Sequence, residues 1–224
     1  MGEYYTWVNI DRKEYIRPSD FNYGSKRHES CSRDGEVLRA LRDLLSKEWK
    51  ECRVFWMGDE CSLPEKSDSE LFSIMKVHCN VSGSGNRMID TVYEDYKNMS
   101  GLFKCAEEQV REEIEFYTEG IRCGKKDLVN EYGIDVLNPY EGLFRREGSD
   151  FGFIVNKTRK IGYSFGITKI CFKNGDETDV IDPLPTLLGY GNYYEPGEWI
   201  GDLIEVTDEL PEGIKLLDSI SLEW

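Results

Sequence analysis

Residues 48–56 read EWKECRVFW, and residues 198–206 read EWIGDLIEV. Both stretches begin with Glu-Trp and continue into residues that are typical of a β-strand. Each is then followed by a pair of acids, Asp59-Glu60 and Asp208-Glu209. The same pattern thus occurs twice in one chain, at an offset of 150 residues.

Two further blocks repeat in the same order along the chain. Val8-Asn9-x-x-Arg12-Lys13 matches Val155-Asn156-x-x-Arg159-Lys160 at an offset of 147. At an offset of 143, the matched apolar positions are Val37, Leu41, Leu44 and Leu45 in the first copy and Val180, Leu184, Leu187 and Leu188 in the second. Three collinear matches predict an internal duplication.

Each copy predicts a strand hairpin, a helix and a final strand. Aromatic and β-branched residues at 5–9 and 151–155 favour the first strands, and the Trp stretches close each copy as a strand. Turns with a glycine at positive φ are expected at 33–35 and 173–175. Apolar spacing predicts a helix from residue 36 to 45, whereas Pro183 and Pro185 restrict the second copy to a short helix.

A helical insertion is expected between the copies. Ser67-Asp68-Ser69-Glu70 has the form of a capping box that opens a helix over 71–77, and apolar stripes predict two more helices. The stripes are Met88, Ile89, Val92, Tyr93 and Tyr96, and Phe103, Ala106, Val110, Ile114 and Tyr117. The sequence therefore predicts an α+β fold of two duplicated strand-hairpin/helix/strand modules, 1–66 and 151–224, with a helical insertion at 67–150, in one compact unit.

Composition indicates a globular, cytosolic protein. The 224 residues are 39% hydrophobic and 12% aromatic, which is too apolar for a disordered chain. No apolar run approaches the length of a membrane span, and the start does not have the apolar core of a signal peptide. The seven cysteines are odd in number and contain no CxxC, which indicates reduced thiols.

The net charge of −15 is concentrated near the C-terminus. Residues 176–224 contain thirteen acids and one base, a net charge of −12, which leaves −3 for residues 1–175. This charge argues against direct nucleic-acid binding and against anionic membranes, and favours a basic protein partner.

Several short motifs resemble catalytic or ligand sites, and each has a simpler structural interpretation. Gly162-Tyr163-Ser164-Phe165-Gly166 fits GxSxG, but both histidines precede it and the following ITKICF is typical of a strand, so we interpret it as a glycine-flanked strand. The glycine-rich Ser82–Asn86 stretch could bind phosphate, but it has no Walker lysine and is interpreted as a flexible connection.

Two sets of residues are candidate metal ligands. His28, Cys31, His78 and Cys79 offer zinc ligands if the two elements converge. The pairs Asp59/Glu60 and Asp208/Glu209 could hold a divalent metal or act in acid–base chemistry. We favour core cysteines and solvated strand ends, with no catalytic residue and no cofactor.

The strongest candidate for a functional site is a tyrosine-rich loop. The second copy carries Gly-Tyr-Gly-Asn-Tyr-Tyr-Glu-Pro-Gly at 189–197, where the first copy has only a short connection to Trp49. Tyrosines on surface loops are typical of binding hot spots, although they can also fold back to cover a core. The predicted partner-binding residues are Tyr190, Tyr193, Tyr194, Glu195, Glu198 and Asp202.

The chain resembles a group of uncharacterised bacterial proteins over about half its length. The shared features are a VN-D-KEY opening, here 8–15, and a W-GD-I-V ending, here 199–206. The resemblance implies a bacterial protein but no particular activity, and tyrosines here replace the group's GNG loop.

Three functions are compatible with these sequence features. The preferred one is a noncatalytic protein-binding module with an acidic, tyrosine-bearing face, most concretely a toxin-neutralising immunity protein. The alternatives are a metal-dependent enzyme or hydrolase that uses the paired carboxylates or His28 and Glu29, and an anti-defence or DNA-mimic protein.

Overall fold

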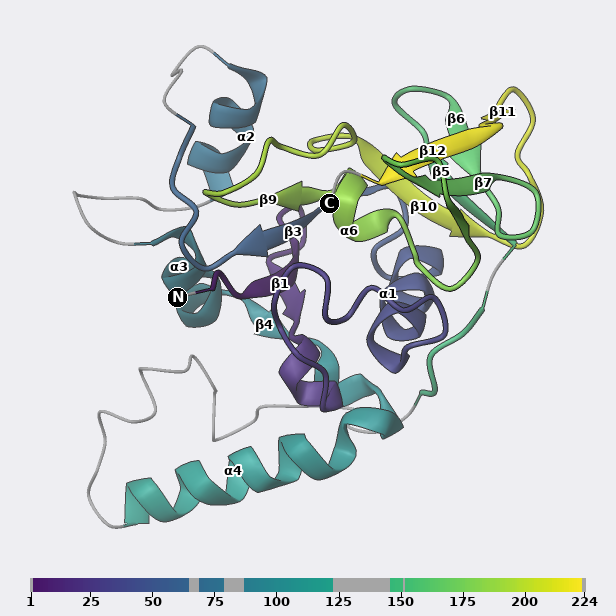
Figure 1. Cartoon of the computed structure of the whole chain (residues 1–224). Coiled ribbons are helices and arrows are strands. Elements are labelled where there is room, and N and C mark those ends of the chain that lie inside the picture. The colour runs from purple at the N-terminus through teal and green to yellow at the C-terminus, as the bar shows by residue number, and fades with distance from the viewer. Residues whose placement is uncertain (1, 65–68, 79–86, 123–145, 151, 223–224) are drawn as a thin grey trace.

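The computed structural model describes residues 2–64, 69–78, 87–122, 146–150 and 152–222 (Figure 1). It is an α+β fold in which a large mixed sheet is covered by helices, with a smaller sheet beside it. No described helix combines the length and apolarity needed to cross a membrane.

The elements occur in three stretches of the chain. The first stretch contains β1 (Tyr5–Asn9), β2 (Glu14–Ile16), the 3-10 helix η1 (Pro18–Phe21), α1 (Glu36–Ser46) and β3 (Cys52–Gly58). The second contains α2 (Glu70–His78), α3 (Met88–Asp95), β4 (Lys97–Asn98), η2 (Ser100–Leu102), η3 (Lys104–Ala106) and α4 (Glu107–Arg122). The third contains β5 (Phe153–Asn156), β6 (Ile161–Tyr163), β7 (Lys169–Phe172), β8 (Glu177–Thr178), α6 (Leu184–Leu187), β9 (Gly189–Tyr190), β10 (Leu203–Thr207), β11 (Lys215–Leu216) and β12 (Ser219–Leu222).

The large sheet has the strand order β11-β6-β5-β10-β3-β1-β2-β4, and β9 also pairs with β3. The two predicted modules meet at its centre, where β3 and β10 run antiparallel with Arg53 opposite Leu203. The smaller sheet, β12-β7-β8, lies beside the second module. The pairing of β3 with β10 thus joins the two modules into one sheet.

The two modules pair their strands in the same register. Val8 lies opposite Tyr15 in the β1–β2 hairpin, and Val155 lies opposite Gly162 in the β5–β6 hairpin. The closing strands agree as well, because Val54 faces Asn9 and Ile204 faces Asn156. These pairs keep the offsets of 147 and 150 found in the sequence.

The hairpin turns are closed by matched hydrogen bonds. The backbone N–H of Arg12 donates to Asn9 Oδ1 at 3.0 Å, and that of Arg159 donates to Asn156 Oδ1 at 3.0 Å. The next residue, Lys13 or Lys160, has a positive φ in both turns. The repeated geometry agrees with the duplicated pattern in the sequence, while common ancestry of the modules remains a prediction.

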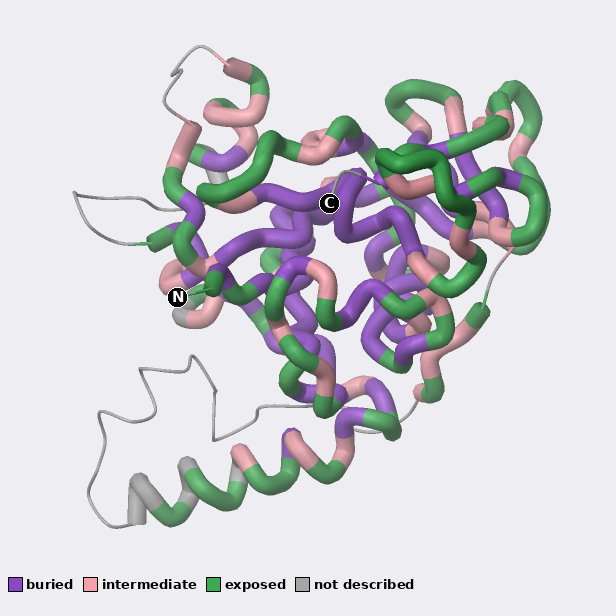
Figure 2. The backbone as a smooth tube through the Cα atoms, in the orientation of Figure 1, coloured by how far each residue is buried: buried purple, intermediate pink, exposed green. Residues whose placement is uncertain are grey.

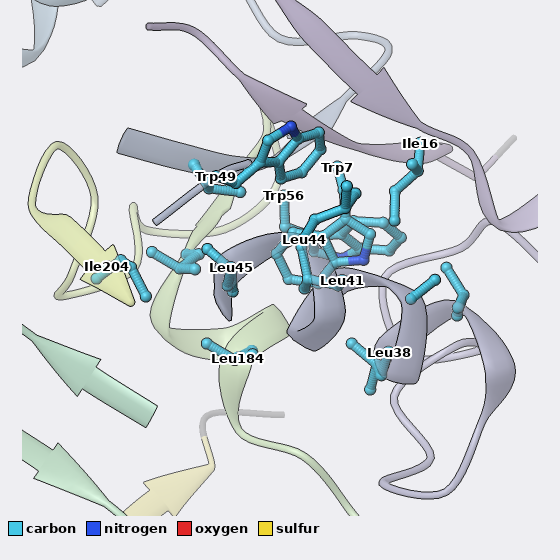
Figure 3. Packing of buried hydrophobic residues seen from close by; sticks show 14 of the residues in the cluster. Trp7, Ile16, Leu38, Leu41, Leu44, Leu45, Trp49, Trp56, Leu184 and Ile204 are labelled. Atoms are coloured by element: carbon cyan, nitrogen blue, oxygen red, sulfur yellow. The ribbon is translucent and has the colours of Figure 1, made fainter. Parts of the chain in front are cut away.

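Both faces of the central strands are buried. On one face, Trp7 and Trp56 pack with the apolar side of α1, and Trp49 and Ile204 complete this core (Figure 3). Alternate residues point to the opposite face because a strand has a period of two. There, Val8 and Phe55 pack with residues of α2 and α3. Figure 2 shows that the buried segments of the chain are concentrated in this central region.

The residues between the modules contribute to both cores. Met88, Ile89 and Val92 of α3 belong to the cluster on the outer face, whereas Phe103 and Val110 belong to the α1 cluster. β4 also pairs with β2 at one end of the sheet. These described residues therefore pack as part of one globular unit.

One predicted turn has a different geometry. Gly35 has φ −65° and serves as the N-cap of α1, so the expected positive φ is wrong at this position. Glycine is favoured there by space, because a Cβ would lie 3.1 Å from the Ser32 carbonyl oxygen. Gly175 does have a positive φ, but its turn joins β7 to β8 rather than leading directly into a helix.

Candidate binding site at the tyrosine loop

The tyrosine loop is held between β9 and the turn before β10. Its start is fixed because Tyr190 pairs with Met57 of β3 and donates a hydrogen bond from its hydroxyl to the Ser62 carbonyl oxygen at 2.8 Å. Tyr190 is only 7% exposed and packs in the outer core cluster. This tyrosine is therefore a structural anchor of the loop and is not presented to a partner.

The next two tyrosines are exposed. A bridge between Gly191 and Tyr194 folds the loop tightly, leaving Tyr193 68% and Tyr194 44% exposed. The Arg27 guanidinium lies 3.9 Å from the centre of the Tyr194 ring, which is a cation–π arrangement. Tyr193 thus offers the larger open aromatic surface.

The three acidic residues predicted to bind a partner also differ in exposure. Glu195 and Glu198 are exposed. Asp202 is buried, and it accepts hydrogen bonds from Asn156 Nδ2 at 2.8 Å and Arg159 Nε at 2.6 Å. It holds the β5–β6 turn against β10 and is unavailable to a partner.

A hollow of about 530 Å³ lies beside the exposed tyrosines. Its lining comes from three separate parts of the chain, namely Gly2, Glu3, Tyr5, Lys26, Arg27, His28, Glu29, Tyr193 and Tyr194. The volume falls within the range of sites that take a small molecule or a partner side chain. Sequence reasoning singled out His28 and Glu29 only for a metal or hydrolase site, and it missed Glu3, Tyr5 and Arg27. No local motif marks these three residues, and the pairing of β3 with both β1 and β9 brings this part of the chain to the loop.

Glu3 is a buried carboxylate at this hollow. It is 6% exposed and accepts hydrogen bonds from the Tyr5 hydroxyl at 2.7 Å and from the Asn192 backbone N–H at 2.9 Å. Glycines make room for it, because a Cβ at Gly58 or Gly191 would overlap the carboxylate. The hollow is therefore built around a fixed negative charge.

Burial also shifts the pKa values of two neighbouring side chains. Burial, together with the hydrogen bond to Glu3, raises the pKa of Tyr5, so its hydroxyl remains a donor. Burial and the nearby Arg27 lower the pKa of His28 to about 4. At neutral pH His28 is uncharged, and its ring meets Tyr194 edge-on with 6.1 Å between the centroids.

The acids of the C-terminal quarter divide by burial. Among the described residues, three of them are buried and each pairs with a base from another element: Asp182 with Arg42, Asp202 with Arg159, and Glu205 with Lys50 and Lys157. Nine are exposed, namely Asp176, Glu177, Asp179, Glu195, Glu198, Asp208, Glu209, Glu212 and Asp218. The surface charge of this quarter is accordingly strongly negative.

The predicted zinc ligands are only partly described. The Cys31 thiol donates to the His28 carbonyl oxygen, and burial raises the pKa of this thiol to about 11. Cys79 and the His78 side chain lie outside the described residues. Within the described parts of the chain, no group of three or more histidine, cysteine or acidic side chains has metal-site geometry, and Cys31, Cys52, Cys61, Cys105 and Cys171 are free thiols.

The structure separates the two carboxylate pairs. Asp59 lies six residues beyond Arg53, and Asp208 lies five residues beyond Leu203, in strands that run in opposite directions. At about 3.3 Å per residue the pairs are roughly 35 Å apart. Asp59 accepts a hydrogen bond from the Tyr4 backbone N–H, and Asp208 and Glu209 are exposed. One shared metal or acid–base site is thus excluded for these four residues.

Ser164 does not occupy a nucleophile elbow. It follows β6 and leads through a turn into β7, so no helix begins behind it. Its hydroxyl contacts only the Phe165 carbonyl oxygen, at 3.4 Å, among the described hydrogen-bond partners. The interpretation as a glycine-flanked strand holds for Gly162 and Tyr163 of β6 only, because residues 164–166 lie in the loop that follows the strand. The phosphate-loop candidate at 82–86 lies outside the described residues.

Comparison of the chain with protein-family models, with curated protein sequences and with solved structures gives no match, so the geometry of the tyrosine loop and the charge of the C-terminal quarter carry the functional argument.

Proposed function

We propose that this chain is a noncatalytic, cytosolic binding protein whose acidic, tyrosine-bearing surface engages a basic partner protein. The observation that carries the proposal is the exposure of Tyr193 and Tyr194 beside a hollow and next to the exposed acids Glu195 and Glu198. Exposed aromatic side chains provide contact area at low entropic cost, and the surrounding acids attract a positively charged partner.

The most specific form of the proposal is neutralisation of a toxin. A compact acidic protein can cover the cationic surface of a nuclease, and complementary charge gives rapid association. The bacterial resemblance and the acidic surface support this form of the proposal. The same charge disfavours direct binding to nucleic acid.

The test is affinity capture from a bacterial lysate at two ionic strengths, followed by identification and purified rebinding of the captured protein. We expect a basic protein that binds at about 0.05 M salt and is released progressively towards about 0.5 M, because the screening length shortens over this range. The matched control is the double variant Glu195→Lys/Glu198→Lys as bait. Capture that is equal for both baits, or that does not depend on salt, would contradict the proposal.

A further inference from the structure

We propose that the hollow beside the tyrosine loop receives a lysine or arginine side chain of the partner, with Glu3 as its counter-charge and Tyr193 as its aromatic wall. This inference rests on the proposed function and names the chemical group that the site recognises. It depends on the carboxylate, the aromatic surface and the balance of charge within the hollow.

The first support is the environment of the Glu3 carboxylate. From the described residues, its two oxygens accept one hydrogen bond each, both from neutral donors, although a carboxylate offers about four acceptor positions. Among the described residues no basic side chain forms an ion pair with Glu3. A buried charge is costly unless it is paired, so a cationic group that enters the hollow would stabilise it.

The second support comes from the way the loop already holds a cation. Arg27 stacks on Tyr194 at 3.9 Å, which shows that a tyrosine face in this loop accommodates a guanidinium. The neighbouring Tyr193 is more exposed, and in the described structure no ring or cation contact involves it. A cation placed between Tyr193 and Glu3 would combine aromatic and carboxylate contacts.

The third support is the charge balance of the lining. The two bases of the hollow are each engaged within the protein, because Lys26 pairs with Glu29 at 3.9 Å and Arg27 packs on Tyr194. His28 is uncharged at neutral pH. Glu3 therefore remains the carboxylate without an ion-pair partner in this lining, and an entering cation can bind it directly.

The experiment uses small capped amino acids as probes of the whole chain. The first probe is lysine whose α-amine is acetylated and whose carboxyl group is an N-methylamide, so that only the side-chain amine is free. It is titrated into ¹⁵N-labelled protein. The matched probes are the same compound with an acetylated side chain and acetyl-glutamate-N-methylamide. The reporter is the backbone amide of Asn192, because this N–H donates directly to Glu3 Oε1.

We expect a saturable shift of the Asn192 amide with the amine probe only. Glu3→Gln should weaken this binding by about tenfold or more, since it removes the charge and keeps the shape. Tyr193→Ala should weaken it by about twofold to fivefold, the size of an exposed cation–π contact, and its exposed position makes it tolerant of substitution. Glu115→Gln, at an exposed position on α4, is the charge-matched control and should bind as the wild type does.

Several results would overturn the inference. It is wrong if the acetylated or the acidic probe shifts Asn192 as strongly as the amine does, if no probe shifts it, or if both Glu3→Gln and Tyr193→Ala bind unchanged. The proposed function fails separately. A pocket that binds the amine in a protein that captures no basic partner contradicts only the function, whereas a salt-sensitive partner unaffected by Glu3→Gln contradicts only the pocket.

Discussion

The indole of Trp49 is fully buried and also donates a hydrogen bond from Nε1 to Glu14 Oε2 at 2.7 Å. Trp49→Ala should lower the free energy of unfolding by about 3–5 kcal/mol, as truncation of a core aromatic does. Trp49→Phe should isolate the loss of the hydrogen bond, worth about 1.5–3 kcal/mol for a charged acceptor. Trp199→Phe, at the matched position in the second module, is the control, and urea denaturation measures all three variants. Equal costs for the two phenylalanine variants would contradict a special role of the Glu14 bond.

His28 predicts a dependence of stability on pH. Its folded pKa of about 4 lies below the unfolded value of 6.5, so the unfolded state binds the proton more readily. The contribution of His28 to the free energy of unfolding is fully present above about pH 6.5 and is lost as the pH falls towards 4. At pH 5.5 the loss should be about 1 kcal/mol, reduced from the full linkage value because the ring is only partly buried.

The measurement is urea denaturation of the wild type and His28→Gln at pH 7.5 and pH 5.5. The variant should lose less stability than the wild type between these values, since glutamine does not titrate. Identical losses in both proteins would show that the partly buried, neutral His28 does not contribute to the pH dependence. The comparison removes the background from carboxylates, which titrate in both proteins alike.

At the level of single residues, the sequence predicted the loop but could not separate its members. Tyr190 and Tyr193 have the same side chain, yet one pairs with β3 and the other lies at the tip. Asp202 resembles its acidic neighbours in sequence, and only the β5–β6 turn that it binds makes it structural. Glu3 carried no signal, because its surroundings are assembled by long-range strand pairing.

The connection before each closing strand offers a matched pair of backbone positions. Glu51 has φ 54° before β3, and Gly201 has φ 81° before β10, at the common offset of 150. Gly201→Ala should destabilise the fold by about 1 kcal/mol, because a side chain is disfavoured at positive φ. Glu51→Gly should be close to neutral or slightly stabilising, because relief of the same conformation offsets the added chain entropy. Thermal unfolding tests the pair, and a stabilising Gly201→Ala would contradict the shared turn geometry.

Most elements with a local periodic signal were predicted. The first strand, the helix after residue 35 and the short helix after Pro183 lie where the pattern places them. The helix predicted over 71–77 is present as α2, and Ser69 caps it, because the Phe72 backbone N–H donates to Ser69 Oγ. Ser67, the cap residue of the predicted box, lies outside the described residues. The pairs β6–β11 and β7–β12 were not predicted, because these short parallel pairings have no sequence signature and depend on residues about fifty positions apart.

At the scale of the whole molecule, the two modules pair their strands alike, but different residues cover the outer faces of these strands. The outer face of the first module is covered by α2 and α3, where Phe55 is buried among apolar residues. The matched position in the second module is Glu205, which is buried against Lys50 and Lys157 instead. The two modules thus share a strand framework, while the acidic surface and the tyrosine loop occur in the second module.

This arrangement predicts that charge and aromatic contact act on different steps of partner binding. Glu195 and Glu198 are exposed, so reversing either charge should mainly slow association, by weakening the long-range attraction of a basic partner. Tyr193 is an exposed aromatic contact, and its truncation to alanine should mainly speed dissociation, because short-range contacts hold a formed complex. Tyr194→Ala should behave similarly but also release Arg27 from its ring.

The measurement is surface-based binding kinetics of the four single variants with the captured partner at low and high salt. Added salt should abolish the differences in association rate while preserving those in dissociation rate. If all four variants bind as the wild type does at both salt concentrations, the interface lies elsewhere and the exposed tyrosines serve the fold alone.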